Sequence, residues 1–200
     1  MDGTRYFLLR EGVPHSDGNY SEKKMVHYLN LELADTLGNL LNRSTSKSIN
    51  SGQVFPVWDS DRYGEFSSTI SKELMSKLES LATDVERPYE NFNFYQGIIS
   101  IMDVLRLTNL FVQEEKPWEL KNTNRDKLEF VLHLTMESLR VCGVTLTPIV
   151  PSISKLLLDK LGIPQSKRLW KDAQCLSWKS GCSQLGLLSK DKTVLYKKLR

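Results

Sequence analysis

Two side chains on one helix face have the chemistry to hold a planar polar ligand. Asn39 and Arg43 are four residues apart in a segment with helical periodicity, so they lie one turn apart on the shoulder of its apolar stripe. A carboxamide and a guanidinium both present flat, forked hydrogen-bonding edges. On these residues alone, a surface cap or a salt bridge is the commoner use of such a pair.

A tryptophan beside a proline could supply a stacking surface. Pro117 fixes the chain at the end of an expected helix and leaves the indole of Trp118 in a loop. Stacking of an aromatic side chain on an unpaired base contributes about 1–3 kcal/mol. The alternative is a hydrophobic lid over the helix ends. We expect the other tryptophans to pack in the core: Trp58, Trp170 and Trp178.

The histidines and cysteines form no catalytic or metal-binding pattern. His15 falls in a turn, His27 on the polar flank of a helix and His133 in an apolar helix, and none follows a nucleophile motif. Cys175 and Cys182 have six residues between them and no histidine close by, which is a poor spacing for zinc. A glycine-rich phosphate loop and a Gly-x-Ser-x-Gly motif are also missing. We therefore predict no catalytic residue and no metal site, and a binding or structural module.

The composition is that of an ordinary folded chain. The 200 residues include 27 Lys or Arg and 24 Asp or Glu, a net charge of +3, and 40% are hydrophobic, which argues against disorder. The length suits one domain, with or without an appendage. Membrane spans of roughly 18 apolar residues are absent from the sequence, so we expect no membrane association. Three scattered cysteines are typical of a reducing compartment.

Apolar residues three and four apart predict a bundle of helices. The pattern indicates helices over about 4–11, 21–43, 70–81, 92–115, 124–142 and 151–161. Pro88 either interrupts the third helix or opens the fourth. Residues 44–66 are expected to form a loop and residues 163–200 short turns with a hairpin or tail. Because strands and helices do not alternate, we predict an all-α fold, an antiparallel bundle of four or five helices with a short irregular C-terminal elaboration.

Three segments, in order, resemble the methionyl-tRNA synthetases. Residues 2–11 (DGTRYFLLRE) and 17–21 (DGNYS) are similar to the segment that follows the KMSKS loop of that family. Residues 32–43 (ELADTLGNLLNR) resemble the opening helix of its anticodon-binding domain, and residues 109–118 its later Asn…Pro-Trp element. The resemblance is strongest to mitochondrial members, which belong to the bacterial-like branch. It implies an anticodon-binding bundle of the class I synthetase type.

The resemblance implies roles for the residues singled out above. Asn39, Arg43 and Trp118 would recognise the CAU anticodon of methionine tRNA, with the tryptophan stacked on one base. Stacking combined with polar contacts to base edges is how proteins recognise unpaired RNA. The basic C-terminal residues would either attract the RNA backbone weakly or form a solvated tail, which is the commoner use: Lys190, Lys192, Lys197, Lys198 and Arg200.

The resemblance also implies what lies outside the sequence. Its HIGH motif, methionine pocket and KMSKS loop are missing, so methionine and ATP with Mg²⁺ would bind elsewhere in a longer enzyme. We expect a C-terminal fragment, inactive alone, of a monomeric enzyme of the mitochondrial matrix, with no transit peptide in this chain. The expected regions are the end of the catalytic-domain connection (1–20), the anticodon-binding bundle (21–162) and a C-terminal extension packed on it (163–200).

Three other functions remain open at this point. One is a non-catalytic RNA-binding protein that uses the same bundle without an attached active site. The bundle also suits a helical interaction scaffold in which Trp118 belongs to the core. Synthetases for other aliphatic amino acids and for cysteine carry similar bundles, so the amino-acid identity depends on the motif resemblance and not on the fold.

Overall fold

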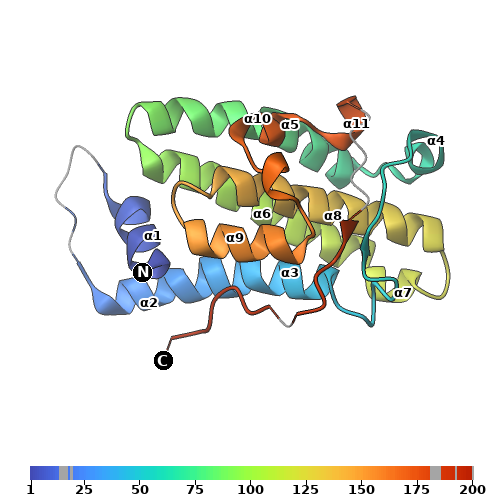
Figure 1. The fold of residues 1–200 in the computed structure, drawn as a ribbon, viewed down its shortest axis with the longest axis horizontal. Helices are drawn as coiled ribbons and strands as arrows, with labels where there is room; N and C mark the ends of the chain where they lie inside the picture. Colours follow the sequence, from blue (N-terminus) through green and yellow to red (C-terminus); the bar gives the residue numbers. More distant parts are fainter. Residues whose placement is uncertain (14–17, 19, 181–185, 192, 200) are drawn as a thin grey trace.

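Long helices run along the longest axis of the molecule (Figure 1). They are α5 (Thr69–Glu90), α6 (Phe94–Glu115), α8 (Arg125–Thr145) and a continuous helical segment over residues 22–44. The all-α prediction is confirmed. The computed structural model describes residues 1–13, 18, 20–180, 186–191 and 193–199. Within these ranges, no helix is long and apolar enough to cross a membrane.

The segment over residues 22–44 is one helix with a widened middle. It consists of α2 (Glu22–Tyr28), the π-helical η1 (Leu29–Gly38) and α3 (Asn39–Ser44). Ser21 caps it as expected, because its hydroxyl accepts a hydrogen bond from the backbone N–H of Lys24. The π-helical middle differs from the regular helix predicted. Its buried leucines recur every four residues, a spacing that suits the wider turn of i→i+5 bonding: Leu29, Leu33 and Leu37.

Shorter elements surround the long helices. Two of them, α1 (Asp2–Glu11) and α9 (Pro151–Lys160), pack against each other and the bundle. The Asp2 carboxylate accepts hydrogen bonds from the N–H groups of Ser152 and Ile153 at 2.8 and 2.9 Å, which caps α9. The remaining helical elements are α4 (Ser60–Tyr63), η2 (Gly64–Phe66), α7 (Pro117–Leu120), η3 (Gln165–Lys167), α10 (Trp170–Gln174) and α11 (Ser177–Ser180).

Residues 44–66 are not the plain loop that was predicted. They contain α4, η2 and the strand β1 (Val54–Phe55), which pairs antiparallel with β2 (Gly186–Leu187). The C-terminal region therefore contributes the strand β2, which pairs with β1 far away in the sequence and not with a neighbouring strand in a hairpin. Local sequence patterns do not show such a pairing, because each strand has only two residues. The expected boundaries at residues 20 and 162 stay predictions.

Pro88 lies inside α5, where it neither interrupts the helix nor opens the next one. The helix continues to Glu90, two residues further. A proline removes one backbone donor and disturbs the preceding turn, so its effect here is confined to the last turn of α5. A short connection then reverses the chain, and α6 runs back along α5 (Figure 1).

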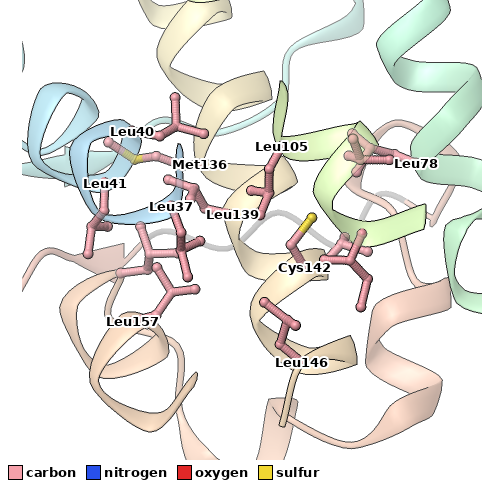
Figure 2. Packing of buried hydrophobic residues seen from close by; sticks show 14 of the residues in the cluster. Leu37, Leu40, Leu41, Leu78, Leu105, Met136, Leu139, Cys142, Leu146 and Leu157 are labelled. Carbon is pink, nitrogen blue, oxygen red and sulfur yellow. The ribbon is translucent and has the colours of Figure 1, made fainter. Parts of the chain in front are cut away.

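The core centres on α8, which the other long helices and α9 surround. Figure 2 shows leucines of α3, α6 and α9 packed around the Met136, Leu139 and Cys142 side chains of α8. Burial raises the pKa of the Cys142 thiol. The three tryptophans expected in the core are partly buried against it.

Buried polar groups on α8 tie the C-terminal region to the bundle. Arg140 pairs with Glu137 at 2.8 Å and donates to the backbone carbonyls of Asp172 and Cys175 at 2.6 and 2.9 Å. Burial alone would raise the pKa of the Glu137 carboxyl. The charge and the hydrogen bonds of its neighbours, Arg140 first among them, together have the larger effect and lower this pKa. Because all of these groups have partners, the C-terminal segment is anchored without an unpaired buried charge.

The structure describes two of the three histidines, His133 and His27. His133 is buried, and its ring nitrogens lie 2.7 Å from the Pro56 carbonyl and 2.7 Å from the Ser177 hydroxyl. Burial lowers the pKa of His133. It is therefore a core histidine, whereas His27 is exposed. His15 lies outside the described residues, as does Cys182.

We expect Gly97→Ala to destabilise the bundle. A Cβ at Gly97 would lie 2.4 Å from Cε1 of Tyr89 across the α5–α6 contact. Overpacking of this kind costs about 1–3 kcal/mol, more than the helix propensity that alanine adds. The measurement is the free energy of unfolding in urea. Gly64→Ala is the control, because nothing lies within 4 Å of its Cβ. Equal stabilities for the two variants would contradict this packing.

Candidate nucleic-acid interface

The end of α6 determines where Trp118 stands. After Glu115 the chain turns sharply, because Lys116 adopts a left-handed conformation with φ 46° and ψ 61°. Pro117 then begins α7, a position where its missing N–H costs nothing. The predicted helix end before Pro117 is confirmed, although Trp118 lies in the short helix α7 and not in a loop. Its side chain is 40% exposed.

Buried Glu115 fixes this corner. Its carboxylate accepts a hydrogen bond from the Ser68 hydroxyl at 2.8 Å and pairs with the Lys127 ammonium at 2.8 Å. Ser68 caps α5 and Lys127 belongs to α8. The corner that carries Trp118 is therefore held by side chains from two further helices.

Arg43 and Trp118 are in contact. The guanidinium carbon of Arg43, on α3, lies 5.5 Å from the centre of the Trp118 ring. A cation over an indole face is attracted to it, by about 0.5–1 kcal/mol at exposed sites. The fold thus brings together two residues that are 75 positions apart in the sequence.

Asn39 lies one turn before Arg43 on α3 and is exposed. Its amide nitrogen donates a hydrogen bond to Oδ1 of Asp35 at 3.1 Å. We call the surface formed by Asn39, Arg43 and Trp118 the α3–α7 surface. All three residues predicted from the sequence belong to it, since Arg43 neighbours both of the others.

An open hollow of about 470 Å³ adjoins the α3–α7 surface. Its lining is polar except for one isoleucine: Asp35, Asn39, Asn42, Arg43, Ser46, Ser48, Ile49 and Asn109. The lining offers hydrogen-bond donors and acceptors together with one acidic and one basic side chain, which suits a polar ligand. Sequence reasoning missed Asp35 as a site residue, although its spacing of four from Asn39 was a usable signal.

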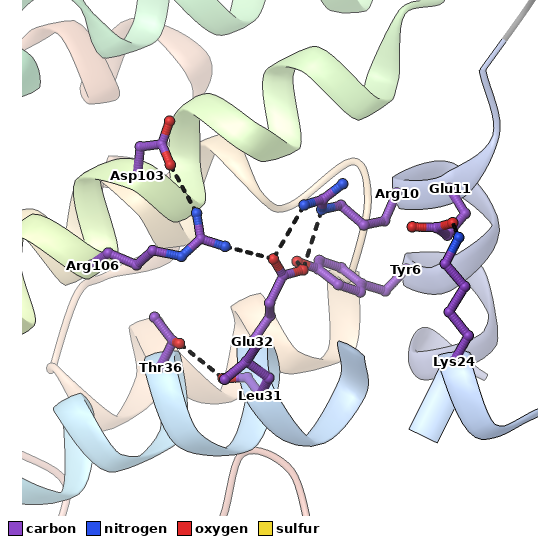
Figure 3. Close-up of polar contacts among 9 residues, drawn as sticks. All are labelled: Tyr6, Arg10, Glu11, Lys24, Leu31, Glu32, Thr36, Asp103 and Arg106. Carbon is purple, nitrogen blue, oxygen red and sulfur yellow. Dashed lines mark hydrogen bonds and ion pairs between the residues drawn. The ribbon is translucent and has the colours of Figure 1, made fainter. Parts of the chain in front are cut away.

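The helix that carries Asn39 and Arg43 is fixed from behind by a buried carboxylate. Glu32 of η1 is 1% exposed and accepts hydrogen bonds from the Tyr6 hydroxyl at 2.6 Å and from Arg106 at 2.8 Å (Figure 3). It also pairs with Arg10 at 3.3 Å. Burial, and then the charge of Glu32, raises the pKa of Tyr6 well above its ordinary value, so the hydroxyl stays a donor.

A second contact between η1 and α6 lies one turn further along. The side-chain amide of Asn109 donates to the backbone carbonyl of Thr36 at 3.1 Å and to that of Leu105 at 2.9 Å. Asn109 follows Arg106 by three residues on α6, and Thr36 follows Glu32 by four on η1. The two contacts hold η1 against α6, and α6 leads directly to Trp118.

The C-terminal basic residues that the structure describes do not form one free cluster. Lys198 pairs with Asp35 at 2.8 Å, next to the α3–α7 surface. Lys190 and Lys197 are exposed. The predictions for Lys192 and Arg200 fall outside the described residues. Within those residues, no group of three or more His, Cys, Asp or Glu side chains could hold a metal ion.

We expect Glu32→Gln to lower the free energy of unfolding by about 3–5 kcal/mol, because it removes the shared buried charge that pairs with Arg10 and Arg106. The control is Asp103→Asn, which removes an exposed carboxylate from the same Arg106. An exposed pair contributes about 0–1 kcal/mol. Urea unfolding of both variants tests the difference, and similar losses would show that Glu32 is no stronger a constraint than a surface pair.

The sequence matches two families of known domains. The one described as the anticodon-binding domain of methionyl tRNA ligase matches residues 59–198, and class I tRNA synthetases (M) match residues 1–45. Asn39 and Arg43 fall in the class I synthetase match, and Trp118 falls in the anticodon-binding match.

Relatives and solved structures agree with these matches. The mitochondrial methionine–tRNA ligases of Takifugu rubripes and Homo sapiens are 36% and 38% identical over 99% and 84% of this chain. The alignments cover 35% and 30% of those relatives, so the chain spans about a third of their length. The apo crystal structure of Mycobacterium tuberculosis methionyl-tRNA synthetase matches the whole chain with a TM-score of 0.84, at 24% identity and over 39% of that protein, which supports the fold.

The anticodon-binding match covers residues 59–198, and the identity to the ligases and the shared fold extend over nearly all of the chain. The chain therefore belongs to the methionyl-tRNA ligase family and contains that family's anticodon-binding domain.

Proposed function

We propose that this chain binds methionine tRNA and that its α3–α7 surface recognises the unpaired bases of the CAU anticodon. The observation that carries the proposal is the Arg43 guanidinium over the Trp118 indole, beside an open polar hollow. Proteins recognise single-stranded RNA by stacking bases on aromatic rings and by hydrogen bonds to base edges. Trp118 offers the ring, and Asn39 with Arg43 offers the hydrogen-bonding groups.

The position of Arg43 supports a double role. Its contact with Trp118 restrains the indole before any RNA binds, so that less conformational entropy is lost on binding. Arg43 also lines the hollow, where its positive charge suits a phosphate or a base edge. The lysine side chains of the described C-terminal segment add a weaker, sequence-independent attraction.

The names of the relatives suggest the setting of this activity. We propose a monomeric mitochondrial enzyme of the matrix that joins methionine to its tRNA at the expense of ATP, with this chain as its tRNA-binding part. Methionine, ATP and Mg²⁺ would bind in the part of the relatives that the chain does not span. The 200 residues alone should not aminoacylate tRNA.

We expect Trp118→Ala to weaken binding of methionine tRNA by about 1–3 kcal/mol, which is roughly five- to 150-fold in Kd, because one stacked base is lost. Trp118→Phe should retain part of the affinity. Filter binding or fluorescence anisotropy with the 200-residue chain gives the constants.

The matched control for this experiment is Phe92→Ala. Phe92 is an exposed aromatic residue, 74% accessible, just before the opposite end of α6. Its removal should leave tRNA binding unchanged. If Trp118→Ala binds tRNA like the wild type but unfolds more easily, Trp118 is a packing residue and the bundle is a scaffold.

A further inference from the structure

We propose that Asp35 is a positioning residue that orients the amide of Asn39, so that this asparagine accepts a hydrogen bond from an amino-bearing base, and that Lys198 neutralises the charge of Asp35 beside the RNA. Cytosine and adenine carry such an exocyclic amino group, whereas uracil and guanine present a carbonyl oxygen at the corresponding place. The inference rests on the proposed function and adds two residues and a base preference to it.

The contacts form a chain from the C-terminal segment to the α3–α7 surface. Lys198 Nζ lies 2.8 Å from Oδ2 of Asp35, and Oδ1 of Asp35 accepts the hydrogen bond from Nδ2 of Asn39 at 3.1 Å. Each oxygen of the carboxylate therefore has its own partner. Asp35 and Asn39 are four residues apart, so both side chains lie on the face that lines the hollow.

Asp35 determines which end of the Asn39 amide faces the ligand. An ionised carboxylate only accepts hydrogen bonds, so the amide end directed at it is the NH₂ group. The carbonyl oxygen of Asn39 is then the group left for a ligand. A carbonyl oxygen accepts from an amino group and repels another carbonyl oxygen, which is the physical basis of the base preference.

Lys198 makes this arrangement compatible with RNA. A lone carboxylate at the rim of the hollow would repel phosphates, whereas the Asp35–Lys198 pair has no net charge. Both side chains are partly exposed, at 36% and 61%, so the pair alone adds little to stability. Lys198 acts on the local charge, and Asp35 acts on the orientation of Asn39.

The C-terminal segment is held in place beside the helix over residues 22–44 (Figure 1). The Asn30 side chain donates to the carbonyl of Leu199 at 2.9 Å and accepts from its N–H at 2.8 Å. Leu195 is buried in the core. These anchors fix the backbone on either side of Lys198, so that pairing with Asp35 costs side-chain entropy but little further backbone entropy.

The test compares two anticodon stem-loop RNAs, one with CAU and one with UAU, which exchange an amino group for a carbonyl oxygen. We expect Asp35→Ala in the 200-residue chain to lower the preference for CAU by about three- to tenfold, the worth of one hydrogen bond. Lys198→Ala should weaken both RNAs by about two- to fivefold and keep the preference. Lys198→Arg should restore binding.

Lys197→Ala is the matched control, since it removes the same charge from the exposed neighbouring residue. It should weaken binding less than Lys198→Ala. Unchanged urea midpoints will show that the variants fold. If Asp35→Ala keeps the full preference while Trp118→Ala weakens both RNAs, the inference is wrong and the proposed function stands. If the wild type has no preference for CAU and Trp118→Ala has no effect, both are wrong.

Discussion

The buried carboxylate of Glu32 is the contact on which the geometry of the α3–α7 surface depends. It joins Tyr6 and Arg10 of α1 and Arg106 of α6 to the middle of the helix over residues 22–44. A buried charge is tolerated only with partners, so these elements cannot separate without a large cost. Because α6 ends at the corner that carries Trp118, the same contact sets the distance between the two halves of the surface.

Side-chain hydrogen bonds stabilise the widened helix η1. In a π-helical stretch the i→i+5 bonds replace the usual ladder, and such stretches are often found at functional sites. Here Asn109 donates to the Thr36 carbonyl, and the Thr36 hydroxyl donates to the carbonyl of Leu31 at 2.8 Å. α3 then continues with ordinary helical geometry from Asn39. Asn39 and Arg43 therefore keep the one-turn spacing that the surface requires.

The positions of the long helices could be predicted from the sequence, but the π-helical stretch and the strand pairing could not. Apolar periodicity located every long helix, but a four-residue spacing of leucines did not distinguish a π-helix from an α-helix. The pairing of β1 with β2 joins residues far apart in the sequence, which local patterns do not encode. Only tertiary structure brings the tail that carries Lys198 to Asp35. Residue chemistry singled out the three members of the α3–α7 surface as candidates, and the family resemblance implied that they recognise the anticodon together.

The α3–α7 surface is where we propose that unpaired anticodon bases bind. The most direct measurement is a crystal structure of the chain bound to a stem-loop RNA with the CAU anticodon. We predict an unpaired base stacked on the exposed indole of Trp118, with Asn39 and Arg43 within hydrogen-bonding distance of a base edge or a phosphate. An RNA bound to another face, with Trp118 free of contact, would contradict the account.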